Sequence, residues 1–168
     1  MTSGFGRAFA FVAQQEGGWS DHASDRGGRT RFGLSSRAHP DVDLDTLTLE
    51  GAREIYRVEY WGGIRGHELP RSIQIALFDW AVHSGPDAAI RGLQRALGVQ
   101  VDGVFGPMTW KALLAAPGAW WGDPQLLQEL LHDRAAQLGA IVRRDASQLD
   151  FIVGWTRRLI DVALASRG

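Results

Sequence analysis

The sequence predicts a mainly α protein, a bundle of helices with a small β-hairpin lobe near residues 20–36. Most of the chain places apolar side chains at helical spacing, in stretches that glycine and proline interrupt. Residues 20–36 lose that spacing and hold turn-forming residues beside a short β-branched and aromatic stretch. At 168 residues, of which 45% are hydrophobic, the chain is long enough for one well-buried core or two small lobes.

The first predicted helix runs from about Gly4 to Gln15. Its apolar side chains recur at helical spacing, and the pair Gly17-Gly18 ends it. Glu16 is therefore expected at a helix C-terminus. The negative end of the helix dipole, together with burial against Trp19, raises the pKa of a carboxyl group in that place and favours the protonated form that a general acid needs.

The hairpin lobe follows directly in the chain. The segment SDHASDRGGRTRFGLSS predicts a turn around Asp25 to Gly28 and a short strand from Thr30 to Leu34. We expect Asp25 and Thr30 to lie opposite the acid at the helix end, an arrangement with which a glycosidase protonates a bridging oxygen and positions a water. The structural alternatives are that Asp25 caps the turn and that Thr30 fills a half-buried strand position.

The remaining helices are predicted from their caps and breakers. Thr48 is the expected N-cap of a helix that ends near Trp61 to Gly63. Pro70 opens a helix that Gly85-Pro86 closes, and its apolar residues on most faces predict the centre of the core and a buried Asp79. Further helices are expected over residues 87–97, 107–114, 124–143 and 147–165.

Composition and spacing exclude several classes of protein. A formal net charge of −1 argues against a nucleic-acid binder, because phosphate neutralisation needs a basic surface. No stretch approaches 18 consecutive apolar residues, which excludes stable membrane insertion. The chain has no cysteine, its histidines lack zinc-peptidase spacing, and Ser84 lacks a nucleophile-elbow motif. We therefore expect neither a cofactor nor a metal.

Eight motifs occur in the order of a known family: EGGW, DRGGRTRFGLS, IYRVEYW, LP, FDWAVHSG, LQRALGV, DGVFGPMT and GWTRRL. Over nearly its whole length the chain resembles the family 108 glycoside hydrolases, which are phage-type lysozymes and N-acetylmuramidases. The resemblance implies a lysozyme-like fold of the α+β lysozyme superfamily, with Glu16 as the catalytic acid. It also implies a catalytic region over residues 1–91 and a helical peptidoglycan-binding-like region over 92–168, which we expect to pack as one fold.

The Glu, Asp, Thr spacing is also similar to the catalytic triad of helical phage lysozymes. This resemblance implies hydrolysis of the β-1,4 bond between N-acetylmuramic acid and N-acetylglucosamine, with Asp25 and Thr30 holding the attacking water and with inversion. Two alternatives stay open: a lytic transglycosylase that uses the same Glu, and a non-catalytic peptidoglycan-binding module. The chain departs from the family at Arg26, Arg29 and His83, where Pro, an acidic residue and Asn are common.

Several aromatic residues are candidates for substrate binding. Faces on which sugar rings pack are predicted for Trp19, Tyr60 and Trp61. His83 either hydrogen-bonds a sugar acetamido group or is a satisfied core histidine, and we favour the structural role. Core positions are predicted for Trp80, Trp110 and Trp155. The pair Trp120-Trp121 either plugs the surface between the lobes or forms a wall-binding patch.

The N-terminus lacks the charged region, unbroken apolar core and small-residue cleavage site of a secretion signal. We therefore expect the protein to be made in the host cytoplasm and to act on the cell wall or periplasm after release, as an endolysin does. Its expected partner is bacterial peptidoglycan, and a monomer is expected.

Overall fold

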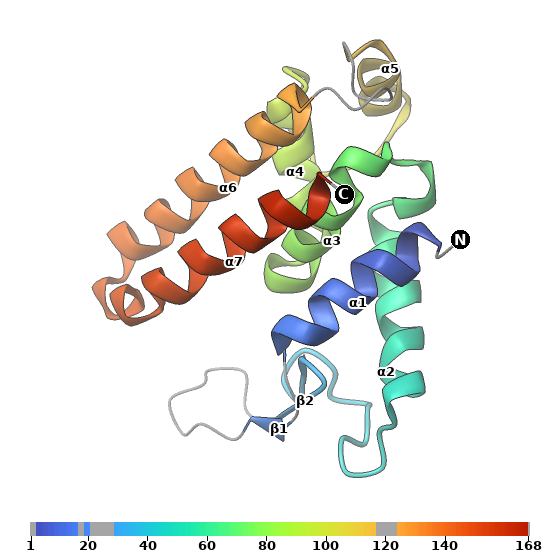
Figure 1. Cartoon of the computed structure of the whole chain (residues 1–168), viewed down its shortest axis with the longest axis vertical. Coiled ribbons are helices and arrows are strands. Elements are labelled where there is room, and N and C mark those ends of the chain that lie inside the picture. The colour runs from blue at the N-terminus through green and yellow to red at the C-terminus, as the bar shows by residue number, and fades with distance from the viewer. Residues whose placement is uncertain (1–2, 17–18, 21–28, 117–123, 168) are drawn as a thin grey trace.

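The computed structural model describes residues 3–16, 19–20, 29–116 and 124–167 (Figure 1). The elements in chain order are α1 (Gly4–Glu16), β1 (Trp19–Ser20), β2 (Thr30–Arg31), β3 (Leu34–Ser35), α2 (Leu49–Ile55), the π-helical η1 (Tyr56–Trp61), η2 (Gly66–Glu68), α3 (Arg71–Ser84), α4 (Pro86–Ala96), α5 (Pro107–Ala115), α6 (Gln125–Arg144), η3 (Ala146–Phe151) and α7 (Ile152–Ser166). The mainly α, lysozyme-like prediction is confirmed.

The strands form one antiparallel sheet in the order β1-β2-β3. Phe32 and Gly33 join β2 to β3 with positive φ angles of 51° and 78°, as in a two-residue hairpin turn. The predicted lobe near residues 20–36 is present. The predicted single strand over residues 30–34 is wrong, because the left-handed backbone at Phe32 and Gly33 folds it into two strands. The turn predicted around residues 25–28 lies outside the described residues.

Local capping sets two helix starts. Thr48 is the N-cap of α2, as predicted, and its Oγ1 accepts a hydrogen bond of 3.1 Å from the Gly51 amide. The helix predicted from residue 147 begins differently. Asp145 Oδ1 accepts from the Ser147 amide at 3.1 Å, and residues 146–151 form a 3-10 turn before α7 begins.

Helix α3 is the centre of the structure, as predicted. It contacts α1, α4, α6, α7 and η1, and Figure 1 shows the other helices around it. Ile73, Leu77 and Phe78 on α3 are fully enclosed, and Asp79 is 5% exposed. A helix that is packed on most sides needs apolar residues on most faces.

Aromatic rings join α1 and η1 to α3. Ring centroids lie 5.6–6.2 Å apart in a cluster formed by Phe5, Phe9, Tyr56, Trp61 and Phe78. Most of these rings meet at steep angles, the arrangement that aromatic pairs prefer to a face-to-face sandwich. The cluster holds α1, and therefore the end of α1 at Glu16, against the core.

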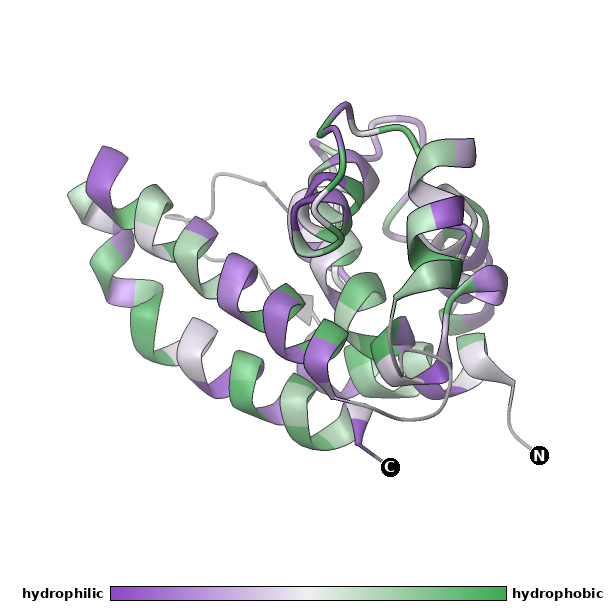
Figure 2. Cartoon of the chain, turned by 90° about the horizontal axis from the view of Figure 1, so that it is seen from above, coloured by the Kyte–Doolittle hydropathy of each residue, from purple (hydrophilic) through white to green (hydrophobic). Residues whose placement is uncertain are grey.

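Helices α6 and α7 form an antiparallel hairpin that packs on α3 (Figure 1). Apolar and polar residues alternate along both helices of this hairpin (Figure 2), as expected of amphipathic helices with one buried face. None of the helices in the described part of the chain has the length and apolar character needed to cross a membrane.

Candidate active site

The fold brings Thr30 back to the end of α1. Glu16 is the last residue of α1 and directly precedes the connection to β1. Thr30 begins β2, is half-buried, and pairs with Ser20 of β1. The side chain of Glu16 and the whole of Asp25 lie outside the described residues. The catalytic roles of Glu16, Asp25 and Thr30 therefore stay predictions.

The sheet is anchored on both sides. Arg29 donates to the carboxylate of Asp45, and this hydrogen bond is the main reason that the pKa of Asp45 lies below its usual value. Arg31 donates to the backbone oxygen of Leu44 at 2.8 Å. The Tyr56 hydroxyl donates to the backbone oxygen of Phe32 at 3.0 Å. These bonds hold β2, and Thr30 with it, against η1 and the loop before α2.

The three aromatic residues predicted to bind sugar differ in their surroundings. Trp61 is 6% exposed, and its ring packs against Phe5 and Phe78. The structure contradicts the predicted sugar-binding role of Trp61, because an enclosed ring offers no face to a ligand. Tyr60 is half-buried, and its hydroxyl lies 2.9 Å from Nε2 of His39. The side chain of Trp19 lies outside the described residues, so Trp19 and Tyr60 stay predictions.

His83 lies in the last turn of α3, where a small polar pocket opens between α3, α6 and α7. Its ring lies roughly perpendicular to the Trp155 ring, with centroids 5.9 Å apart, and its Nδ1 lies 3.2 Å from the Ser84 hydroxyl. Burial, with a smaller contribution from Arg134 and Arg158, lowers the pKa of His83 to about 3. The ring is therefore neutral at pH 7. The pocket is lined by Asp79, His83, Arg134, Leu138, Trp155, Arg158 and Leu159.

Two arginines lie on the wall of this pocket. Arg158 of α7 donates to Oδ1 of Asp79 on α3 at 2.8 Å, and both side chains are largely buried. Arg134 of α6 is 5% exposed, and burial lowers its pKa to about 10. It donates to Ser84 Oγ at 2.9 Å and stacks over the Trp80 ring at 5.2 Å. These contacts join the C-terminal helices to α3.

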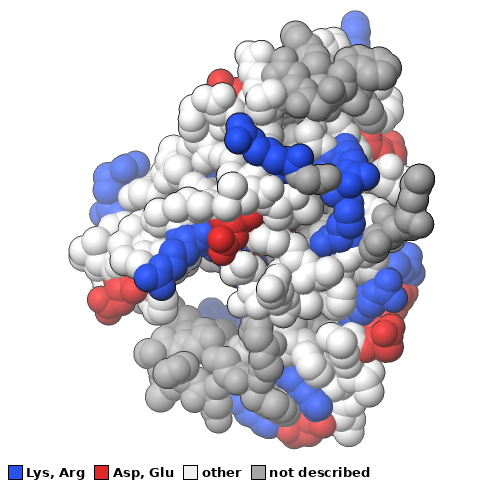
Figure 3. Space-filling view, viewed as in Figure 1, with Lys and Arg blue, Asp and Glu red and all other residues white. Residues whose placement is uncertain are grey.

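The end of α1 also contacts α7. Gln15, the residue before Glu16, donates from Nε2 to Oδ2 of Asp161 at 3.3 Å. Figure 3 shows this face of the molecule hollowed alongside α7. Helix α7 therefore forms one side of a hollow that lies next to the helix end carrying Glu16.

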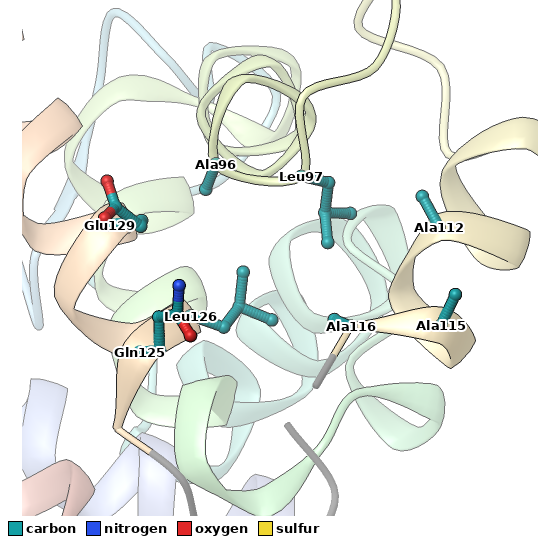
Figure 4. A pocket seen from close by; sticks show the side chains of 8 residues that line it. All are labelled: Ala96, Leu97, Ala112, Ala115, Ala116, Gln125, Leu126 and Glu129. Carbon is teal, nitrogen blue, oxygen red and sulfur yellow. The ribbon is translucent and has the colours of Figure 1, made fainter. Parts of the chain in front are cut away.

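Two larger cavities lie in the C-terminal half. One, of about 340 Å³, lies between the ends of α4 and α5 and the start of α6, and Figure 4 shows Leu97 and Leu126 pointing into it. Half of its lining residues are alanines, and Gln125 and Glu129 lie on the α6 side (Figure 4). The other, of about 360 Å³, lies between α6 and α7. Among the described residues, no group of three or more His, Asp or Glu could hold a metal ion.

Two features of the site were not predicted from the sequence. Trp155 was expected in the core, but it is half-buried on the wall of the small pocket between α3, α6 and α7. No role for Arg134 is predicted from the sequence. A signal for it exists, because Leu130, Arg134 and Leu138 follow one another at intervals of four residues, and all three are buried. A charged residue within an apolar stripe of a helix indicates a buried polar contact.

Comparison with known proteins agrees with this architecture. Residues 9–85 match the family described as Glycosyl hydrolase 108, and residues 88–160 match a predicted peptidoglycan domain. The structure of Brucella abortus SagA is similar, with 32% sequence identity and a TM-score of 0.83; the match covers 96% of this chain and 92% of SagA. No curated protein sequence matches the chain. The chain belongs to the glycosyl hydrolase 108 family and is a lysozyme-like protein that degrades peptidoglycan.

Proposed function

We propose that the protein hydrolyses the β-1,4 bond between N-acetylmuramic acid and N-acetylglucosamine. Glu16, as general acid, donates a proton to the oxygen of the leaving N-acetylglucosamine. Asp25, helped by Thr30, activates the water that attacks C1 of the muramic acid. This function is supported by the place of Glu16 at the end of α1, directly before the strand that pairs with Thr30. Backbone carbonyls at a helix C-terminus disfavour the ionised carboxylate, which suits an acid.

The proposed stereochemistry is inversion, because a water held by Asp25 attacks the face of the sugar opposite the leaving group. The first product is then the α-anomer of the new reducing end. Proton NMR of the anomeric signals in the first minutes of the reaction distinguishes this product from the β-anomer that a covalent glycosyl-enzyme intermediate yields.

The experiment that tests the function is mass spectrometry of soluble fragments released from purified peptidoglycan. Hydrated, reducing muramic acid ends are expected from the parent protein, and no fragments are expected from Glu16→Gln. The amide has nearly the shape of the carboxyl group but is not an acid, so this variant keeps the fold and loses proton donation. Circular dichroism and thermal unfolding check that it is folded.

Other products identify the alternatives. Anhydromuramic ends identify a lytic transglycosylase, in which the sugar's own hydroxyl replaces water and Asp25 is not required. Reducing glucosamine ends or cleaved peptides contradict both muramic acid reactions. No fragments, with tight sedimentation on the wall polymer, identify a peptidoglycan-binding module.

We also propose that the protein is made in the host cytoplasm and acts on the wall as a monomer after release, in the manner of a phage endolysin. The resemblance to phage-type lysozymes supports this proposal. Light scattering of the purified protein tests the oligomeric state, and a dimer contradicts the proposed monomer. Fractionation of lysing cells tests the release, and protein exported before lysis contradicts it.

A further inference from the structure

An aromatic pair lies at the start of α7. The rings of Phe151 and Trp155 are nearly parallel, with an interplanar angle of 24° and centroids 6.1 Å apart. Phe151 is 48% exposed and Trp155 is half-buried. The two are four residues apart, so consecutive turns present them on one side of the helix.

This pair differs from the core tryptophans. Trp61 and Trp80 are 6% and 2% exposed, so packing within the protein accounts for both rings. Phe151 stacks on the Trp155 ring and His83 lies roughly perpendicular to it, yet the pair keeps aromatic surface in contact with solvent. Exposed aromatic surface that is held in a fixed orientation is typical of a binding site.

The position of Trp155 connects it with the candidate active site. Trp155 lines the same pocket as Asp79, and Arg158 joins α7 to α3 one turn further along the helix. One more turn along α7, Asp161 accepts the hydrogen bond from Gln15 beside Glu16. The residues on these successive turns of α7 therefore lead from the aromatic pair to the end of α1.

We propose that Trp155, backed by Phe151, is a subsite on which a sugar ring of the peptidoglycan strand packs. The occupant is a pyranose ring, because its apolar C–H face fits an indole face and its hydroxyl and amide groups stay in water at the rim. The inference rests on the proposed function. If Trp155 is such a subsite, the region that matches the peptidoglycan domain, residues 88–160, supplies one wall of the glycan groove.

Neutral His83 fits this role. The ring of His83 meets the Trp155 ring at 82°, edge to face. Burial and, to a smaller extent, Arg134 and Arg158 in the same pocket make a positive charge on His83 unfavourable, so the histidine stays uncharged. His83 thereby fixes the orientation of the indole without bringing a further charge to the groove.

The test is the steady-state kinetics of fragment release from soluble glycan strands that carry no cross-links. Trp155→Ala is expected to raise KM roughly fivefold to tenfold, the loss of one aromatic stacking contact, and to change kcat less than twofold. Trp155→Phe is expected to recover most of the difference. The matched control is Trp110→Ala, because Trp110 is also a half-buried tryptophan but lies on α5 against Phe105. This control is expected to keep the parent KM.

A purely structural role predicts a different result. Trp155→Ala would then lower the melting temperature and the fraction of active protein but leave KM unchanged. With an active parent protein, this result overturns the inference and leaves the proposed function intact. If the parent releases no fragments, the proposed function fails. The inference is then decided by equilibrium binding of the same strands to the Glu16→Gln protein with and without Trp155→Ala. Equal affinity overturns it. A third result overturns the inference in favour of a membrane surface. In that case Trp155→Ala has the parent KM, and the parent protein binds anionic vesicles whereas Phe151→Ser does not.

Discussion

Gln15 on α1 and Asp161 on α7 are joined by a hydrogen bond of 3.3 Å between Nε2 and Oδ2. The two residues are far apart in the chain, and Gln15 directly precedes the proposed acid Glu16. Gln15 lies in the region that matches the glycosyl hydrolase, whereas most of α7 lies in the region that matches the peptidoglycan domain. The bond therefore links the helix end that carries the acid to the second region of the chain.

Asp161→Ala is expected to lower kcat by about tenfold or less with little change in melting temperature. The bond is exposed and contributes little to stability. It restrains the last turn of α1, and small displacements of a catalytic group slow the chemical step. Asp150→Ala is the control, because Asp150 is also an exposed carboxylate in this C-terminal segment. Equal kcat values for the two variants would contradict the role of the bond.

Asp79→Ala is expected to destabilise the fold by about 3 kcal/mol, because it removes the carboxylate from a largely buried ion pair with Arg158. Urea unfolding measures the free energy. Asp87→Ala is the matched control. Asp87 pairs with Arg91 on the surface of α4, where solvent screens the interaction, so no measurable loss is expected. A similar loss of unfolding free energy in both variants would show that the buried Asp79–Arg158 pair stabilises the fold no more than the exposed Asp87–Arg91 pair.

Stability is expected to fall between pH 6.5 and pH 3 in a way that depends on His83. Its folded-state pKa is about 3 against an ordinary value of 6.5, so in this range the unfolded chain binds a proton that the folded protein does not. Stability from this group is fully present above pH 6.5 and decreases as the pH falls. Between pH 7 and pH 5 the loss is up to about 2 kcal/mol. His83→Gln is expected to remove this part of the slope in urea unfolding, and a slope equal to that of the parent would refute the prediction.

Gly92→Ala is expected to destabilise the protein by about 1–3 kcal/mol. A Cβ at Gly92 on α4 would lie 2.2 Å from the buried Trp80 ring, so helix α4 or the ring must shift. Gly154→Ala is the control within another helix. A Cβ there meets no other atom within 4 Å among the described residues, and loss of glycine flexibility in a helix stabilises by roughly 0.5–1 kcal/mol. Opposite shifts in melting temperature are expected, and shifts of the same sign would contradict the packing argument.

Some parts of the site were predictable because their causes are local. Glu16 was placed at a helix end by the apolar spacing before it and the glycine pair after it, and Thr48 was recognised as a cap from its own side chain. The two-residue turn at Phe32-Gly33 was missed. It requires a left-handed backbone at a phenylalanine, which residue preferences disfavour.

The sequence by itself determined the helices, most of their ends, and the family to which the chain belongs, because periodicity, caps and motifs depend on neighbours along the chain. Only the tertiary structure decided which tryptophan is enclosed. Trp61, like Tyr60 before it, was predicted to pack against a sugar ring, yet it is covered by Phe5 and Phe78. Trp155, on an amphipathic helix, was predicted to lie in the core, yet it stays half-buried beside His83. The exposure of a ring depends on which distant elements pack over it, and spacing within its own helix does not contain that information.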